Sequence, residues 1–404
     1  MIQISEVVRR NFGRRVIAVS AAATLACVTL VTGCGESTPQ PVGQVKSHSS
    51  DAAPVSPTGQ PVAVIAKDSS AATQEAPVQW TDFPFMTSAD AVVSVIQPAA
   101  LAESPALKKL FSALPAGKVN LPIPPAETEW VAIYATPLVD DDGGLTGDTT
   151  MVLKLNRPSS VYEIAESRFD TDQLEDVEVN GRSYLRVSGL SQETIEVTTD
   201  ADGNASEILN LNVAPQMAVY EHDEFTFVVC EEGRLPFVLD RSEIESPLRT
   251  LVGNADSDSP IFVAASFQDR PMLSDALKNQ ASSLGDGSLF QTLAANTESV
   301  ILIGDFEGKD LLTLSLTAAG TEQADSIEKS VQASAKGAAE FLQQMQAFAA
   351  PETKMLFETG QNLVQGVSVS RNGNTIDVAM TNSGDLPVFF SSLAAMFGQR
   401  LAAK

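Results

Sequence analysis

The sequence predicts an α+β fold in which two tandem related units, each an antiparallel sheet covered by helices, follow a signal peptide and a disordered linker. Three observations lead to this expectation: short strands with alternating apolar residues, one long amphipathic helix, and similar blocks that recur in the same order. The expected divisions are residues 1–33 for the signal peptide, 34–80 for the tether, 81–255 for the first unit and 256–404 for the second.

The N-terminus carries the pattern of a lipoprotein signal peptide. Four arginines between residues 9 and 15 precede the apolar stretch Val16–Val31, which leads into Thr32-Gly33-Cys34. A stretch of about 16 residues is short for a membrane span of roughly 20 but suits a signal peptide. We expect cleavage before Cys34 and its lipidation, which places the protein outside the cytosol on a membrane, in the periplasm or cell envelope. An uncleaved anchor helix is the alternative.

Residues 35 to about 80 form a predicted tether. They are rich in Ser, Pro, Ala, Gln and Thr and show no hydrophobic period. Such a composition buries too little apolar surface to offset the entropy of ordering the chain. As a flexible coil the tether has a root-mean-square reach of about 35–40 Å.

Charge and cysteine content exclude several classes of partner and bond. Removing residues 1–33, which carry four Arg and one Glu, moves the net charge from −25 to −28. An acidic body repels phosphate backbones, so nucleic acid is excluded as a partner. With Cys27 removed and Cys34 acylated, Cys230 is left without an intrachain disulfide partner and is predicted to be a buried core thiol.

Four pairs of blocks suggest a duplication. At an offset of 170, Val92–Val95 and Ala106–Lys108 match Phe262–Ala265 and Ala276–Lys278; Trp130–Tyr134 matches Ser299–Ile303 at 169, Met151–Leu155 matches Leu312–Leu316 at 161, and Gly233–Phe237 matches Gly384–Val388 at 151. The shrinking offset is attributed to an inserted loop at Asp140–Asp148 and a polar excursion at Ser191–Asn210 in the first unit.

Local patterns predict the remaining elements. A stripe of apolar residues at three- and four-residue steps predicts a helix from about Glu322 to Ala349, capped by Thr321 and packed on a sheet. Hairpins are predicted about His222-Asp223 and Asn372-Gly373, each followed by Gly, two residues and Pro.

No catalytic constellation emerges, and no catalytic residue or cofactor is predicted apart from one calcium candidate. Asp200, Asp202 and Asn204 place oxygen ligands as calcium loops do. However, Ala205 stands where such loops need Gly, and Leu211 stands where a closing Glu is expected. A solvated Asx-rich turn is the alternative interpretation.

Several motifs resemble those of a family of secreted and lipid-anchored planctomycete envelope proteins with duplicated α+β units. They are Ser88-Ala89-Asp90-Ala91-Val92-Val93, Gln97-Pro98, Ser104-Pro105-Ala106-Leu107 and Val177-Glu178-Val179-Asn180-Gly181-Arg182-Ser183-Tyr184. The resemblance covers roughly residues 87 to 400. It implies an envelope location and brings no catalytic residues with it.

The resulting hypothesis is a non-enzymatic cell-envelope lipoprotein that acts as a binding or structural module. Its expected partners are the membrane, through lipidated Cys34, and an envelope protein or polymer. The groove between the two units is the first place to expect a ligand. The alternative is an extracytoplasmic hydrolase that uses carboxylates or a calcium-dependent acidic loop.

Overall fold

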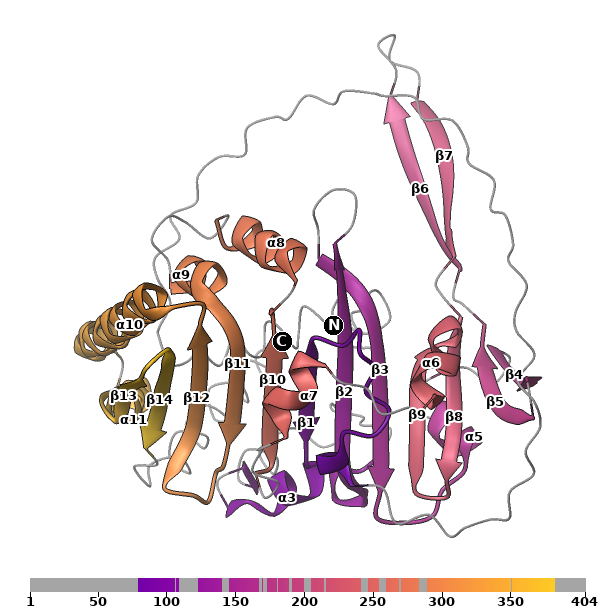
Figure 1. Ribbon diagram of the computed structural model, residues 1–404, viewed down its shortest axis with the longest axis horizontal. Coiled ribbons are helices and arrows are strands. Elements are labelled where there is room, and N and C mark those ends of the chain that lie inside the picture. Colours follow the sequence, from indigo (N-terminus) through magenta and orange to yellow (C-terminus); the bar gives the residue numbers. More distant parts are fainter. Residues whose placement is uncertain are drawn as a thin grey trace.

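The computed structural model describes residues 79–381, except 106, 109–122, 140–144, 167–168, 170–172, 180, 189–190, 200–204, 214–215, 241–245, 254–258, 269, 283–288 and 350. It shows an α+β protein built on a large antiparallel sheet with several helices, as predicted (Figure 1).

The elements before residue 255 are η1 (Trp80–Asp82), β1 (Val92–Ile96), α3 (Pro98–Glu103), η2 (Pro125–Glu127), β2 (Thr128–Val139), β3 (Leu145–Leu155), α5 (Val161–Glu166), β4 (Leu174–Val179), β5 (Arg182–Val187), β6 (Ser191–Thr199), β7 (Ala205–Val213), β8 (Met217–Asp223), β9 (Thr226–Glu231), η4 (Glu232–Arg234), α6 (Leu235–Leu239) and α7 (Pro247–Val252).

The elements after residue 255 are β10 (Ile261–Ser266), α8 (Pro271–Ser282), α9 (Leu289–Asn296), β11 (Thr297–Gly304), β12 (Asp310–Ala318), α10 (Thr321–Phe348), α11 (Pro351–Gln365), β13 (Val367–Asn372) and β14 (Thr375–Thr381).

Twelve of the described strands form one continuous sheet, which corrects the expectation of a separate sheet in each unit. The strand order is β13-β14-β12-β11-β10-β1-β2-β3-β9-β8-β5-β4. At its centre β1 pairs antiparallel with β10, in the register Val93↔Ala264. The junction where a groove was expected is therefore a backbone-paired ladder of two strands.

The strand order and register also bear on the matched sequence blocks. Outward from the centre, β1-β2-β3-β9-β8 and β10-β11-β12-β14-β13 run in corresponding order. An offset of 170 equates Val92 with Phe262, yet Phe262 pairs with Val95. Directly paired residues share a face, and Val92 and Val95 are three apart, so the matched residues lie on opposite faces. The pairing therefore does not support the match at this offset.

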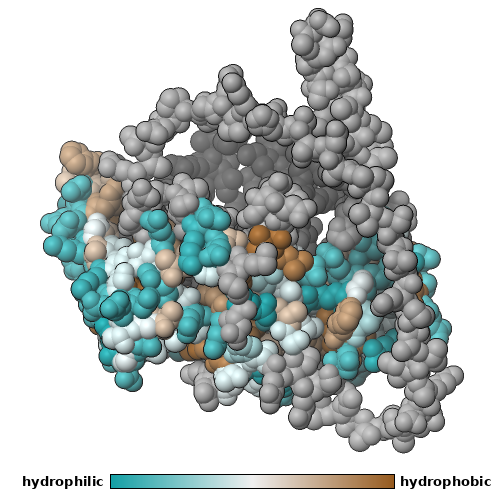
Figure 2. Space-filling model, turned by 45° about the horizontal axis from the view of Figure 1, so that its top comes forward, coloured by the Kyte–Doolittle hydropathy of each residue, from teal (hydrophilic) through white to brown (hydrophobic). Residues whose placement is uncertain are grey.

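The sheet has two faces of different character. We call one the helical face, because α5, α8, α9 and α10 contribute to its apolar clusters or pack beside them. We call the other the aromatic face, after Trp130 and Tyr134 of β2. The aromatic face is covered near the centre by the segment before β1 and by α6 and α7. On the face of the molecule seen in Figure 2, the described surface is mainly hydrophilic, with scattered apolar side chains.

Two predicted connections differ in the structure. Part of the loop expected at Asp140–Asp148 is strand, because β3 begins at Leu145 and pairs with β2 up to Val139. The polar excursion at Ser191–Asn210 forms most of a separate two-stranded ribbon, β6 and β7, which projects from the main sheet (Figure 1).

Both predicted hairpins form, with turns slightly displaced. The turn between β8 and β9 lies at Glu224-Phe225 and not at His222-Asp223, and the Asp223 carboxylate accepts a hydrogen bond from the Phe225 amide at 2.8 Å. The turn between β13 and β14 includes Gly373, whose φ of +61° favours glycine. Pro236 lies in the first turn of α6, as predicted.

The long helix is confirmed as α10, which begins at Thr321 after Gly320. Its first half packs on the helical face through Ala324, Ile327 and Val331. The predicted stripe continues to Phe348, but that side chain is 88% exposed. The helix therefore extends beyond the part of the sheet that its first half covers.

We predict that Ile327→Ala destabilises the protein by about 2–5 kcal/mol, since it deletes apolar atoms from a fully buried site. Phe348→Ala, on the same helix, is expected to change stability by about 0.5 kcal/mol or less. Urea unfolding of residues 35–404 measures both. Equal losses would contradict the assignment of the packed stripe.

Candidate functional site

A buried ion pair joins the strands at the centre of the sheet. Asp90 lies just before β1 and Arg234 ends η4; their side chains are 0% and 8% exposed. The Arg234 Nη2 group donates to Asp90 Oδ1 at 2.5 Å. These two residues are 144 positions apart in the chain, so the contact fixes the segment after β9 against the segment before β1.

Three threonines complete the hydrogen bonding of this pair. Arg234 also donates from Nε to Thr150 Oγ1 at 2.7 Å and from Nη1 to Thr136 Oγ1 at 2.8 Å. Thr136 in turn donates to Asp90 Oδ1 at 2.9 Å, while the Thr87 amide and hydroxyl donate to Asp90 Oδ2 at 2.6 and 3.0 Å. The cluster thus ties together β2, β3, η4 and the segment before β1.

The second half of the chain reaches the same place through Arg270. Its guanidinium donates to the backbone oxygens of Ala89, Asp90 and Ser88 at 2.8, 3.1 and 3.3 Å. Burial lowers the pKa of Arg270, and the nearby Asp90 carboxylate opposes this shift. Residues 87–90 are consequently held from both halves of the sheet.

This geometry gives the cluster a structural role. Both Asp90 oxygens accept two hydrogen bonds each, so the carboxylate has little remaining capacity to bind a substrate. Two further carboxylates lie nearby: Asp148 is 3.8 Å from Arg234, and burial together with Asp148 raises the pKa of Glu231. Within the described residues, no three His, Cys, Asp or Glu side chains are grouped to hold a metal ion.

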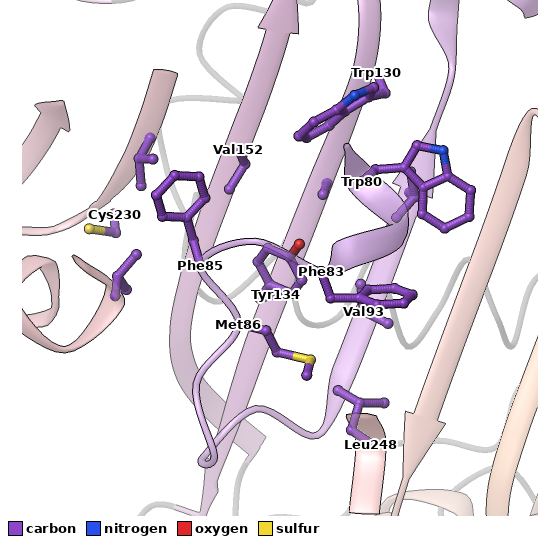
Figure 3. Packing of buried hydrophobic residues seen from close by; sticks show 14 of the residues in the cluster. Trp80, Phe83, Phe85, Met86, Val93, Trp130, Tyr134, Val152, Cys230 and Leu248 are labelled. Carbon is purple, nitrogen blue, oxygen red and sulfur yellow. The ribbon is translucent and has the colours of Figure 1, made fainter. Parts of the chain in front are cut away.

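Beside the cluster, the segment Trp80–Met86 lies across the aromatic face (Figure 3). We call this segment the plug. The Trp80 and Phe83 rings contact Phe262 of β10 at centroid distances of 5.6 and 6.1 Å. Trp80 was expected to end the tether, but it is buried in the core.

The plug is held in a strained backbone conformation. Phe83 and Phe85 have φ values of +46° and +67°, in the left-handed region that bulky residues avoid. Each such residue costs on the order of 1–3 kcal/mol and persists only where its surroundings fix it. Both side chains are buried, so packing on the sheet imposes this conformation.

Two polar atoms on β2 near the plug have no hydrogen-bond partner within the described chain. They are Trp130 Nε1 and Tyr134 Oη, on side chains that are 1% and 0% exposed. A buried unsatisfied group of this kind costs roughly 1–3 kcal/mol. Burial raises the pKa of Tyr134 well above its usual value, and Asp90 adds to the rise.

The predicted core thiol is confirmed. Cys230 is fully buried on β9, and burial raises its pKa to about 12. A thiol that stays protonated at neutral pH is a poor nucleophile, so its role is packing. Trp130 is likewise a core residue, and the His222 ring packs against Phe85 at 5.3 Å.

The predicted lipidation and calcium residues lie outside the described residues: Cys34, Asp200, Asp202 and Asn204. No helix in the described part of the chain is long and apolar enough to cross a membrane.

The sequence analysis missed the roles of Asp90, Arg234 and the plug. Asp90 and Arg234 lie in motifs that it noted only as part of a strand signal and a strand-to-helix turn. In a chain with many acidic residues, an Asp and an Arg at the ends of secondary-structure elements do not indicate from the sequence that they pair with each other. The dense aromatic run Trp80-Thr81-Asp82-Phe83-Pro84-Phe85 was available as a signal of core packing and was not used.

We predict that Arg234→Met destabilises the protein by about 3–5 kcal/mol, because it leaves the Asp90 charge buried without its partner. The double variant with Asp90→Asn is expected to lose less than the sum of the two single losses. Arg157→Met serves as a control, since Arg157 is 39% exposed and solvent screens its ion pairs, so its loss is expected to be much smaller. Additive losses in denaturant unfolding would contradict coupling between Asp90 and Arg234.

Comparisons with known proteins identify no family for this chain. No family model matches the chain, and no curated protein matches it. A solved structure titled "Structure of crystal form I of TP0453" is similar over 77% of this chain and 93% of that chain, at 11% identity and a TM-score of 0.35. Similarity at this level carries no argument about function.

Proposed function

We propose that the protein is a non-enzymatic, lipid-anchored envelope protein whose body binds a neutral, hydroxyl-rich polymer such as a cell-wall glycan. The anchor follows from the signal peptide pattern that ends at Cys34, and the tether sets the reach of the body. The two halves of the sheet are, in this proposal, related units that have diverged on the aromatic face.

The observation that carries the binding proposal is the composition of that face over β11–β14. Cross-strand pairing aligns its residues in three rows: Ser299, Thr317, Thr375 and Asn372; Ile301, Ser315, Asp377 and Ser370; Ile303, Thr313, Ala379 and Ser368. We call them the hydroxyl rows. The opposite face of the same strands carries Leu, Ile and Val under α10.

The hydroxyl rows are accessible to differing degrees. The β13 residues Ser368, Ser370 and Asn372 are exposed, and the other members are partly buried. Ser315 donates to Asp377 Oδ1 at 2.5 Å, which orients the middle row. A sheet face that carries hydroxyls in place of apolar side chains favours a polar contact over an internal core.

The spacing of the hydroxyl rows and the charge of the protein indicate which class of polymer could bind. The positions in the rows recur about every 4.8 Å across strands and about every 7 Å along them, and seven of the twelve carry a hydroxyl, an arrangement suited to a polymer with regularly placed polar groups. The net charge of −28 expected for the cleaved chain disfavours an anionic polymer. A neutral glycan satisfies both conditions.

We predict that Cys34→Ala abolishes acylation and membrane association. Cys27→Ala is the matched control, because it removes the other cysteine near the apolar stretch and is expected to leave processing intact. Intact-mass measurement and membrane fractionation of the expressed full chain give the result. A product that still begins at Met1 in the unaltered protein would contradict the signal peptide assignment.

We predict that Ser315→Ala, Thr317→Val and Ser370→Ala together weaken binding to an insoluble neutral glycan (cellulose or chitin) at least ten-fold, since three hydrogen bonds of roughly 0.5–1.5 kcal/mol each are lost. Co-sedimentation of residues 35–404 at 0.15 M salt measures the affinity. Ser326→Ala with Ser334→Ala on α10 is the control and is expected to bind normally. The proposal fails if the unaltered chain does not sediment or if the control is equally weakened.

A further inference from the structure

The plug is attached to the rest of the protein in an asymmetric way. Its C-terminal end is fixed, because Thr87 donates twice to Asp90 and Arg270 holds the oxygens of Ser88 and Ala89. Its N-terminal end continues into the tether. No strand of the sheet includes plug residues, so the twelve-stranded ladder does not depend on them. The plug can therefore swing away about Thr87 without breaking a backbone ladder.

The plug residues also stabilise their own conformation poorly. Phe83 and Phe85 both hold positive φ values that relax once their side chains leave the sheet. The contacts that resist displacement are those of the apolar cluster, with Trp80, Phe83 and Phe262 at its centre. A molecule that replaces those apolar contacts allows Phe83 and Phe85 to leave their strained backbone conformation.

The surface next to the plug is suited to such a molecule. Trp130 and Tyr134 are four residues apart on the same face of β2, with the small side chain of Ala132 between them. Figure 3 shows the Tyr134 hydroxyl on the side of its ring that faces Trp130. The neighbouring strands contribute the apolar residues Val93, Val95, Phe262 and Ala264.

The two unsatisfied groups define the polar part of the ligand. The Trp130 indole donates only, and the Tyr134 phenol stays protonated and donates, so both favour an acceptor oxygen. The apolar cluster contains no charged side chain, and the charged groups that act on Tyr134 are Asp90 and, in the opposite direction, Arg249. A buried anion would be unfavourable there, which selects a neutral ester oxygen over a carboxylate.

We propose that the plug Trp80–Met86 is displaceable and covers a binding site on the aromatic face for a neutral long-chain acyl ester, with Trp130 Nε1–H and Tyr134 O–H as the hydrogen-bond donors. The site borders the hydroxyl rows at Ile301 and Ile303 of β11, which pack against the same apolar cluster, but it does not depend on the proposed binding of a glycan.

Intrinsic fluorescence tests the displacement directly, because the chain has two tryptophans, one on the plug and one on β2. In the unaltered chain both tryptophans contribute, and Trp80→Phe, which leaves Trp130 and its donor in place, gives the signal that is subtracted to isolate Trp80. Methyl oleate delivered from cyclodextrin to residues 35–404 is expected to increase acrylamide quenching of Trp80 at least three-fold. Unchanged quenching at saturating methyl oleate would overturn the proposal.

Tyr134→Phe separates a ligand contact from a packing role. Removing an unsatisfied hydroxyl is expected to leave the thermal midpoint unchanged or raised, while the affinity for methyl oleate falls about ten-fold. Tyr184→Phe is the matched control: its hydroxyl donates to Glu232 Oε1 at 2.6 Å, so the midpoint should fall with unchanged affinity. A lowered midpoint with unchanged affinity in Tyr134→Phe would assign the hydroxyl to the static core and overturn the site.

Oleate, the free fatty acid, distinguishes a neutral ester from a fatty-acid anion as the ligand. The free acid is expected to bind at least ten-fold more weakly than methyl oleate at pH 8, where it is an anion in water. Equal binding of oleate would overturn the assignment of a neutral ester.

Discussion

The ion pair between Asp90 and Arg234 fixes the region on which the rest of the molecule is arranged. It lies where β1 begins, and its hydrogen bonds reach β2, β3 and η4. Arg270 adds a contact from the second half of the chain. Because the pair is buried, its contribution to stability depends on all of its hydrogen-bond partners being present. Loss of Asp90 or Arg234 leaves the other charge desolvated and unpaired. This requirement favours a single arrangement of the strands around it.

The antiparallel α+β class, the long helix α10 and both hairpins were predictable because their signals are local. Apolar residues at steps of two or three to four residues report the face of one strand or helix, and Gly373 marks its turn directly. The continuous sheet was not predictable in the same way. Pairing of β1 with β10 uses backbone groups that every strand carries, so the sequence gives no sign of which edges meet.

The candidate site was less predictable than the fold. Asp90 and Arg234 are 144 residues apart, and neither belongs to a spaced motif that chemistry would require. The block offset of 170 shows a related difficulty, since a register shift of one residue exchanges the two faces of a strand while leaving the sequence match plausible. The hydroxyl rows become visible only when β12, β13 and β14 are laid side by side in their actual register.

The position of the plug connects the proposed membrane anchor with the proposed binding of a ligand. The tether leads into Trp80, and seven residues later Thr87 is bonded to the central ion pair. A force or a steric constraint applied through the tether therefore acts first on the plug, whose backbone is strained, and is resisted next at the rigid cluster of Asp90. In the proposal above, a ligand that occupies the aromatic face releases the plug and adds about seven residues to the predicted tether. Seven extended residues add up to roughly 24 Å of reach, so occupancy of the site and distance from the membrane are coupled by chain geometry alone.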